Sequence, residues 1–348
     1  MVSQPFRMSC LTSANPAHGD TLLPKRSTLA PTFADVEEAR ARIADHTFRT
    51  PLRHYPSLSE LIGAEIWVKH ENFQILGAFK VRGGINLVSQ LSGDELAAGL
   101  ITASSGNHGQ SIAFAAKTFG APCVIVVPEG ANPDKVRSIR DLGADVVFYG
   151  EFYDFSRAEA ARLAREEGYR YVDAADEPAL IAGVATYSSE IFEDLNDIDT
   201  LIVPVGAGSG ASGACIVREA VSPSTEVIGV QSSEAPAAQI SWKTGVITEA
   251  PMATDAEGLA TGTGFEVPQA ILRELLNDFV LVSDAEISAA VCLYLEHTHT
   301  LVEGAGAAAL AGAVSLKDRL AGKRVVLIAS GANLAMRQLR QAVDNTPA

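Results

Sequence analysis

Short apolar runs alternate along the chain with stretches whose apolar residues recur at helical spacing. Six runs rich in β-branched residues predict buried strands, at 66–70, 123–129, 144–150, 200–206, 226–232 and 324–330. Between some of them, alanine-rich amphipathic stretches predict helices, at 109–120, 132–143 and 154–168. Apolar strands that alternate with helices are typical of parallel sheets covered by helices on both faces. The pattern therefore predicts an α/β protein built from open, twisted, largely parallel sheets.

Regular structure is expected to begin near residue 31. Residues 1–30 are rich in Ser, Thr, Pro and Asn and predict a loose N-terminal arm. Thr32 and Asp35 then have the spacing of a capping box, which predicts a helix start. Asn132 and Gly143 bracket a later helix in the same way. With 348 residues the chain can form two lobes, and we expect those lobes to be interleaved in sequence.

Composition excludes several classes of function. The 27 basic and 42 acidic residues give a formal net charge of −15 without a basic stripe, so we expect no binding to nucleic acid or to an anionic membrane. No apolar run is long enough to span a bilayer. The four cysteines, at positions 10, 123, 215 and 292, lie too far apart for a metal motif or a disulfide framework. Their scarcity favours a cytoplasmic protein with buried or spare thiols.

Chemically unusual loops occur where predicted strands end, which is where ligands bind in parallel sheets. They are Ser104-Ser105-Gly106-Asn107-His108, the glycine-rich segment 206–210 and Ser330-Gly331-Ala332-Asn333. A fourth segment, 77–84, places Lys80 among glycines and apolar residues.

The glycine-rich segment predicts a phosphate site, because a glycine turn at a helix start presents backbone N–H groups and the positive end of the helix. Gly208, Gly210 and Gly213 also match the dinucleotide fingerprint, which leaves an NAD-dependent oxidoreductase as an alternative. The next predicted strand, however, ends at Gln231 rather than at an acidic residue that could bind a ribose. A single phosphate fits better than a dinucleotide, and a simple packing turn remains a further alternative.

Lys80 would be a surface charge in most contexts, but its neighbours predict another role. Phe79 precedes it and small residues surround it, so a flat ring could approach the backbone closely. A lysine removed from water has a destabilised ammonium form and becomes a nucleophile. A nucleophilic lysine and a site for one phosphate together suggest pyridoxal 5'-phosphate, an aldehyde cofactor.

Four segments in order resemble the fold-type II pyridoxal-phosphate enzymes. They are KHENFQILGAFKVRGG, SSGNHGQS, VPVGAGSG and ASGANL, and the resemblance extends from about Pro31 to about Ala342. Within these enzymes the chain is most similar to the threonine/serine dehydratase and serine racemase branch. The resemblance implies a fold like that of the tryptophan synthase β chain. It also implies a large cofactor-binding domain of residues 31–98 and 176–345 and a small mobile domain of residues 99–175.

The resemblance implies a role for each candidate site residue. Lys80 matches the lysine that links covalently to the cofactor, and Phe79 matches the residue against its ring. Asn107 matches the partner of the phenolic oxygen, and Ser330 matches the partner of the pyridine nitrogen. The phosphate would be bound by Gly206, Ala207, Gly208, Ser209 and Gly210. The substrate carboxylate would be bound by Ser104, Ser105, Gly106, Asn107 and His108.

Three side chains keep two interpretations each. Ser105 matches the second acid/base of racemases, so we count it with Lys80 as catalytic. Glu303 either approaches the cofactor ring or caps the small-residue helix that follows, and we favour the ring. Arg157 matches an arginine near the substrate in the racemase branch, but its helix pattern favours a solvated side chain.

Gln231 and Ala237 occupy positions where the racemase branch has acidic cation ligands, so no metal site is predicted.

The resemblance implies removal of water and then ammonia from L-threonine, L-serine or a related β-hydroxy amino acid, giving a 2-oxo acid. Alternatives are serine racemisation and a specialised dehydratase, of the hydroxyectoine-pathway or 3-hydroxyaspartate type. The irregular segment 232–265 would line the substrate entrance. The expected partner is a small-molecule amino-acid substrate, and the expected assembly is a homodimer or homotetramer.

Overall fold

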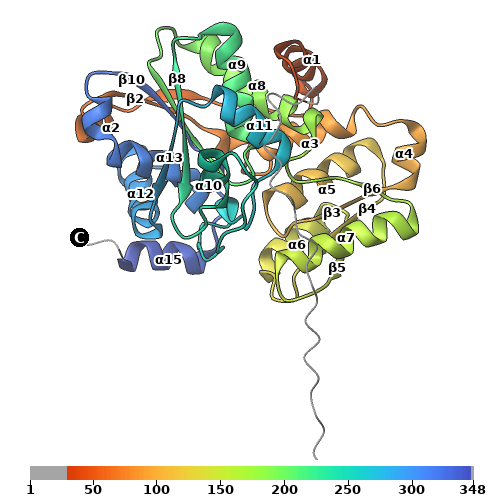
Figure 1. Ribbon diagram of the computed structural model, residues 1–348. Coiled ribbons are helices and arrows are strands. Elements are labelled where there is room, and N and C mark those ends of the chain that lie inside the picture. Colours follow the sequence, from red (N-terminus) through yellow and green to blue (C-terminus); the bar gives the residue numbers. More distant parts are fainter. Residues whose placement is uncertain (1–29, 346–348) are drawn as a thin grey trace, which may run out of the picture.

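The computed structural model describes residues 30–345 and contains two sheets (Figure 1). The predicted arm therefore lies outside the described residues, apart from Ala30, and so does Cys10. The six-stranded sheet has the order β1-β2-β10-β7-β8-β9 and the four-stranded sheet the order β5-β4-β3-β6. All neighbouring strands run parallel except β1 and β2, which pair antiparallel.

Strand bounds agree with the apolar runs, and each predicted run overlaps a strand. The six-stranded sheet consists of β1 (Leu52–His54), β2 (Glu65–Lys69), β7 (Thr200–Pro204), β8 (Glu226–Ser232), β9 (Asp278–Val282) and β10 (Arg324–Ile328). The four-stranded sheet consists of β3 (Leu100–Ala103), β4 (Cys123–Val127), β5 (Asp145–Phe148) and β6 (Arg170–Tyr171).

The six-stranded sheet is buried on both faces because successive side chains of a strand point to opposite sides. In β7, Leu201 and Val203 join the core that contains α8, α9 and α11, whereas Ile202 joins the core that contains α2, α12 and α13. In β10, Val326 and Ile328 face the first core. These helices are α2 (Pro56–Ile62), α8 (Pro178–Asp194), α9 (Ser209–Val221), α11 (Glu266–Leu275), α12 (Asp284–Thr298) and α13 (Gly304–Ser315).

The four-stranded sheet is covered in the same way. Ile125 and Val127 of β4 pack into the core shared with α5 (Asn107–Phe119) and α6 (Pro133–Asp141). Val124 and Val126 face the other side, where Ala160 of α7 (Tyr153–Glu167) covers them. The α/β fold predicted from the sequence, with parallel-rich sheets between helices, is confirmed.

The remaining helices complete the layers. They are α1 (Phe33–Ile43), α3 (Lys80–Val88), α4 (Gly93–Ala98), α10 (Ala237–Thr244), α14 (Lys317–Leu320), α15 (Met336–Asn345) and the 3₁₀ turns η1 (Glu71–Phe73) and η2 (Glu257–Leu259). The capping box of Thr32 and Asp35 is present at the start of α1. Asn132 caps α6, as predicted, by accepting a hydrogen bond from the Asp134 N–H at 2.9 Å.

Three cysteines are free and buried, as expected, at positions 123, 215 and 292. Within residues 30–345, none of the helices combines the length and apolar character needed to cross a lipid bilayer.

Candidate active site

Loops from both sheets line a cavity of about 810 Å³ at the carboxyl ends of β3, β7 and β10. This volume is typical of sites that bind small ligands. All candidate site residues predicted from the sequence line the cavity, although they come from five separate segments. They are Phe79, Lys80, Ser104, Ser105, Gly106, Asn107, His108, Gly206, Ala207, Gly208, Ser209, Gly210, Glu303 and Ser330.

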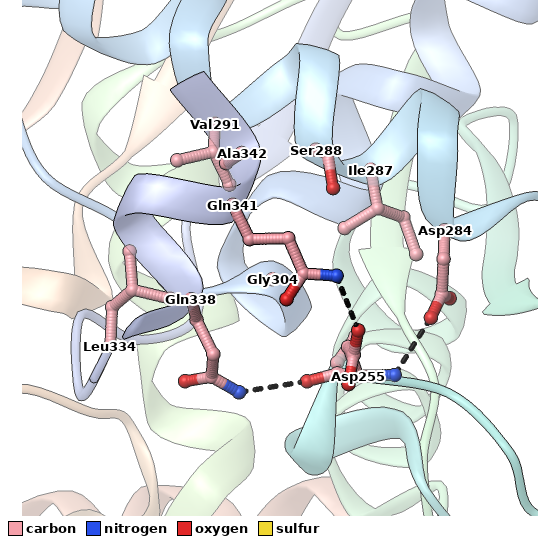
Figure 2. A pocket seen from close by; sticks show the side chains of 11 residues that line it. Asp255, Asp284, Ile287, Ser288, Val291, Gly304, Leu334, Gln338, Gln341 and Ala342 are labelled. Atoms are coloured by element: carbon pink, nitrogen blue, oxygen red, sulfur yellow. Dashed lines mark hydrogen bonds between the residues drawn. The ribbon is translucent and has the colours of Figure 1, made fainter. Parts of the chain in front are cut away.

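A second, much smaller pocket of about 40 Å³ lies beside α12, α13 and α15 (Figure 2). Its acidic side chains accept hydrogen bonds. Asp284 accepts hydrogen bonds from the Thr254 hydroxyl at 2.6 Å and the Asp255 N–H at 2.7 Å, and Asp255 accepts one from Gln341 Nε2 at 2.9 Å. No group of three or more His, Cys, Asp or Glu in residues 30–345 could hold a metal ion. The hydrogen bonds at this pocket connect α15 to Asp255. The large cavity is the candidate active site.

Lys80 is the first residue of α3 and its amine lies at the glycine-rich segment. The Nζ atom donates hydrogen bonds to the Ser209 hydroxyl at 2.9 Å and to the Ala174 carbonyl at 3.3 Å, and it lies 5.5 Å from the centre of the Phe79 ring. Burial lowers the pKa of the Lys80 ammonium to about 8, and the Asp173 carboxylate opposes this shift. Because neither hydrogen-bond partner is an anion, a substantial fraction of the amine is neutral near pH 8 and can act as nucleophile or base.

The glycine-rich segment turns sharply from β7 into α9. Gly208 has a φ of +100°, which favours glycine, and a Cβ at Gly206 would lie 2.2 Å from the Gly258 carbonyl oxygen. Helix α9 begins at Ser209, so its first N–H groups have no intrahelical partners and point toward the cavity end of the helix. The segment thus has the backbone form of an anion site.

The same segment does not extend into a dinucleotide site. A Cβ at Gly213 would lie 2.8 Å from Ala185 Cα, so the third glycine of the fingerprint permits close packing of α9 against α8. At the end of the next strand, β8, the buried Gln231 accepts a hydrogen bond from the Gln239 N–H at 3.0 Å. With no carboxylate there for a ribose, the loop suits one phosphate.

Asn107, Glu303 and Asn333 form a hydrogen-bonded row at the cavity wall. Asn107 Nδ2 donates to Glu303 Oε1 at 2.7 Å, and Asn107 Oδ1 accepts from Asn333 Nδ2 at 2.6 Å. Glu303 occupies the N-cap position of α13 but makes no side-chain cap bond, so of its two interpretations the structure favours the one that faces the cavity. Burial raises the pKa of the Glu303 carboxyl, partly offset by Lys135 and Asn107. Asn333 lies in a motif seen in the sequence, but its contact with Asn107 was not predicted.

The loop from Ser104 to His108 connects β3 to α5. Ser104 Oγ accepts the Gly106 N–H at 3.2 Å, which fixes the turn before the helix. The Thr102 hydroxyl donates to the Val172 carbonyl at 2.7 Å, so it accepts from His108 Nε2 at 3.0 Å. Burial lowers the pKa of His108 to about 3, and the ring is therefore neutral at physiological pH. The loop presents Ser105 and neutral hydrogen-bonding groups to the cavity, without a carboxylate.

The loop after β10 holds the lysine segment from the other side. The Phe79 N–H donates to the Ser330 carbonyl at 3.1 Å, and Ala78 and Gly331 form an isolated β-bridge. Ser330 is 5% exposed and lines the cavity. Ser330 therefore contributes a neutral hydroxyl to the cavity wall.

Arg157, for which the helix pattern favours a solvated side chain, is 36% exposed and also reaches the site. Its side chain lines the cavity, 5.6 Å from the centre of the Phe265 ring and 3.4 Å from Asp173 Oδ2. Arg157 lies three residues before Ala160, which packs on the sheet, so the two share the inward side of α7. Sequence reasoning also missed Lys135 and Glu257, which line the cavity and form an ion pair at 2.5 Å.

The residues present fit pyridoxal 5'-phosphate. An amine with a lowered pKa lies beside a helix N-terminus that suits one phosphate, and hydroxyl and amide groups surround the space between them. Segment 252–265, predicted to line the entrance as part of 232–265, contributes Met252, Thr261 and Phe265 to the cavity wall.

Comparisons with known proteins agree with this chemistry. Residues 43–331 match the family model described as pyridoxal-phosphate dependent enzyme. The chain is 36% identical to an L-threonine ammonia-lyase of Geobacter sulfurreducens, over 89% of this chain and 77% of that protein. It is 35% identical to an L-threo-3-hydroxyaspartate ammonia-lyase of Saccharomyces cerevisiae, over 89% of this chain and 95% of that protein. The structure of maize serine racemase superposes with a TM-score of 0.84 at 30% identity, over 90% of this chain and 97% of that one. The Lys80 amine, the anion-binding form of segment 206–210 and the match over most of the chain agree with one another. The protein belongs to the pyridoxal-phosphate-dependent enzyme family.

Proposed function

We propose that the chain is an ammonia-lyase that removes water and then ammonia from L-threonine, L-serine or a related β-hydroxy amino acid. The observation that carries the proposal is the position of the Lys80 amine, beside the phosphate-type loop and without an anionic partner. The similarity to two ammonia-lyases supports the same reaction class.

In this proposal each part of the cofactor would have a partner among the cavity residues. The N–H groups of segment 206–210 would bind its phosphate, and Asn107 and Ser330 would bind its ring substituents. Phe79 would lie against the ring face. Ser104, Ser105, Gly106, Asn107 and His108 would bind the substrate carboxylate, because this loop presents backbone N–H groups at the start of α5.

When bound, pyridoxal phosphate withdraws electrons from the substrate and makes its α-proton acidic. Lys80 Nζ then accepts the α-proton, and the low pKa of its amine matches this role near neutral pH. Ser330 would lie at the ring nitrogen and, being neutral, would add no charge there. Neutral His108 and the surrounding loop hold the carboxylate so that the α-proton faces the amine.

Two observations support other substrates or outcomes in the same site. Arg157 could pair with a second substrate carboxylate, which favours a 3-hydroxyaspartate-type dehydratase. Ser105 lines the cavity and could act as a second acid/base, which favours racemisation. A dehydratase of the hydroxyectoine pathway is a third variant.

The test is release of 2-oxo acid from a panel of β-hydroxy amino acids, with and without added cofactor. We expect activity on at least one member, loss of activity by at least about 10³-fold in Lys80→Ala, and none lost in Lys117→Ala, which removes an exposed lysine of α5. Faster formation of D-serine than of pyruvate would assign a racemase, and preference for 3-hydroxyaspartate would assign the acidic substrate. Full activity of Lys80→Ala would refute the proposal.

We further propose a cytoplasmic homodimer or homotetramer in which residues 99–175 move as a small domain. Exposed apolar side chains near the lysine segment support association, namely Phe48, Phe73, Ile75 and Leu301. They are close in space, because Gln74 bonds to the Phe48 backbone and Asn72 bonds to the Leu301 carbonyl. Light scattering measures the assembly, and a concentration-independent monomer would contradict it.

A further inference from the structure

The glycine-rich segment carries a side chain that contacts the reactive amine directly. Ser209 is 2% exposed, is the first residue of α9, and its hydroxyl lies 2.9 Å from Lys80 Nζ. The role expected for this segment needs only backbone N–H groups, so the hydroxyl is an addition to it. We propose that Ser209 is the positioning residue of Lys80, and that its hydroxyl holds the amine in place and stabilises its ammonium form. This proposal rests on the proposed function for its catalytic consequence.

A hydroxyl can accept a hydrogen bond from the amine in either protonation state and can also donate one to the lone pair of the neutral form. The second partner, the Ala174 carbonyl at 3.3 Å, can only accept. Ser209 therefore keeps the amine at one place before and after it takes up a proton.

The hydroxyl also limits how far burial lowers the pKa. Burial lowers the pKa of the Lys80 ammonium, and the Asp173 carboxylate opposes this shift. A hydrogen bond from the ammonium to the Ser209 hydroxyl, 2.9 Å away, acts in the same direction as Asp173. Bonds to charged groups are stronger than bonds between neutral groups. Loss of the hydroxyl therefore destabilises the ammonium more than the neutral amine, and the pKa of Lys80 falls.

A neighbouring serine provides a matched control. Ser212 lies three residues later on α9, is fully buried, and its hydroxyl has no hydrogen-bond partner within residues 30–345. Ser212→Ala removes the same atom from the same helix without touching Lys80. Ser209→Thr restores a hydroxyl and serves as the rescue variant.

The experiment measures acetylation of Lys80 against pH in the full chain without cofactor, by mass spectrometry of the peptide that contains it. We expect a midpoint near pH 8 in the wild type, as its pKa implies, and the same midpoint in Ser212→Ala. In Ser209→Ala we expect a fall of about one pKa unit, and Ser209→Thr should recover most of it. Circular dichroism checks that each variant folds, and a variant that fails to fold is replaced by Ser209→Gly.

The holoenzyme provides the second readout. Ser209→Ala should move the acid limb of the kcat–pH profile to lower pH and lower kcat, while KM changes by less than about twofold. A midpoint in Ser209→Ala equal to that of the wild type would overturn the proposal. So would weaker binding of the cofactor with an unchanged midpoint, because the hydroxyl would then serve the phosphate alone. If the wild type releases no 2-oxo acid, the proposed function fails, and the labelling still decides the role of Ser209.

Discussion

Glu303 is an acidic side chain in a place where its charge is unfavourable. It is 8% exposed, and its hydrogen bonds with Asn107 Nδ2, at 2.7 Å, and with the Asn333 backbone do not replace the lost hydration. Burial raises its carboxyl pKa above the ordinary 4.5. In the folded chain the carboxyl therefore binds its proton at a pH at which the unfolded chain has already released it.

The pH dependence of stability tests this assignment. As the pH rises from about 4.5 through the higher folded pKa, the wild type loses free energy of unfolding, because the folded state binds more protons in that window. Glu303→Gln keeps an oxygen for Asn107 but does not titrate. Relative to the wild type, the variant should therefore gain stability across this window, and the gain should be constant above it.

Urea unfolding of the full chain at a series of pH values, without added cofactor, measures this difference. Glu60→Gln, at an exposed position, is the control for loss of one negative charge. A difference between Glu303→Gln and the wild type that does not change with pH would contradict the assignment.

At the residue scale, the sequence predicted which side chains line the site but not how they contact one another. Lys80, Asn107 and Ser330 lie in recognisable segments, and all three reach one cavity. The contact between Asn107 and Asn333 joins residues 226 positions apart, and local spacing carries no information about it. Arg157 shows the same limit, since its orientation depends on which face of α7 packs on the sheet.

The element that carries Lys80 is held by a buried ionic network. Arg82, in the first turn of α3, bonds to Glu71 of η1 at 2.8 Å and to Glu190 of α8 at 2.7 Å. Lys69 of β2 completes the network through Glu190 at 2.5 Å. Burial opposes the charge of Arg82, but the two carboxylates outweigh it and raise its pKa. The network fixes the start of α3 to three other elements.

Breaking this network should destabilise the fold strongly. Arg82→Met leaves Glu71 and part of Glu190 as buried, unpaired carboxylates, and we expect a loss of about 3–5 kcal/mol. Arg137→Met, which removes an exposed ion pair with Asp134 on α6, should lose less than about 1 kcal/mol. Chemical denaturation measures both. Equal losses would show that the buried network does not hold α3.

At the element scale, long apolar runs were easy to find and short strands were not. Strand β3, Leu100–Ala103, has only four residues. They are too few to form a recognisable run of β-branched residues before the Ser104 loop. Strand β9, Asp278–Val282, lies at a sheet edge and is partly exposed, so its pattern is not apolar throughout. The antiparallel strand β1 has three residues and no pattern from which its direction could be read.

At the scale of the whole molecule, one ion pair links the two sides of the cavity. Lys135 of α6, beside the four-stranded sheet, bonds to Glu257 of η2 at 2.5 Å. Gln338 of α15 donates to Glu257 at 3.3 Å and to the Asp255 carbonyl at 2.9 Å, the second of which is drawn in Figure 2. The hydrogen bonds of Gln338 thus connect α15 to Glu257, one of the two residues of the ion pair across the cavity.

Loss of this link should weaken substrate binding more than chemistry. Since the Glu257 side of the pair is exposed, Lys135→Met should raise KM by up to about fivefold at low salt, and the effect should fade as salt increases. Lys117→Met is the matched control. Steady-state kinetics at two ionic strengths measures the effect. A fall in kcat at constant KM would contradict a role in holding the two sides together.

The arrangement of the two sheets could not be predicted from the pattern alone. Alternating strands and helices give the parallel sheets, but strands β2 and β10 are neighbours although they lie more than 250 residues apart. Their pairing comes from burial of both faces of the sheet, which is a property of the whole chain.

The most direct test is borohydride reduction of the purified holoenzyme, followed by peptide mass spectrometry. The account predicts a yellow protein that loses its visible band and retains one reduced cofactor on Lys80. Attachment to another lysine, such as Lys69 or Lys135, or no attachment at all, would contradict it.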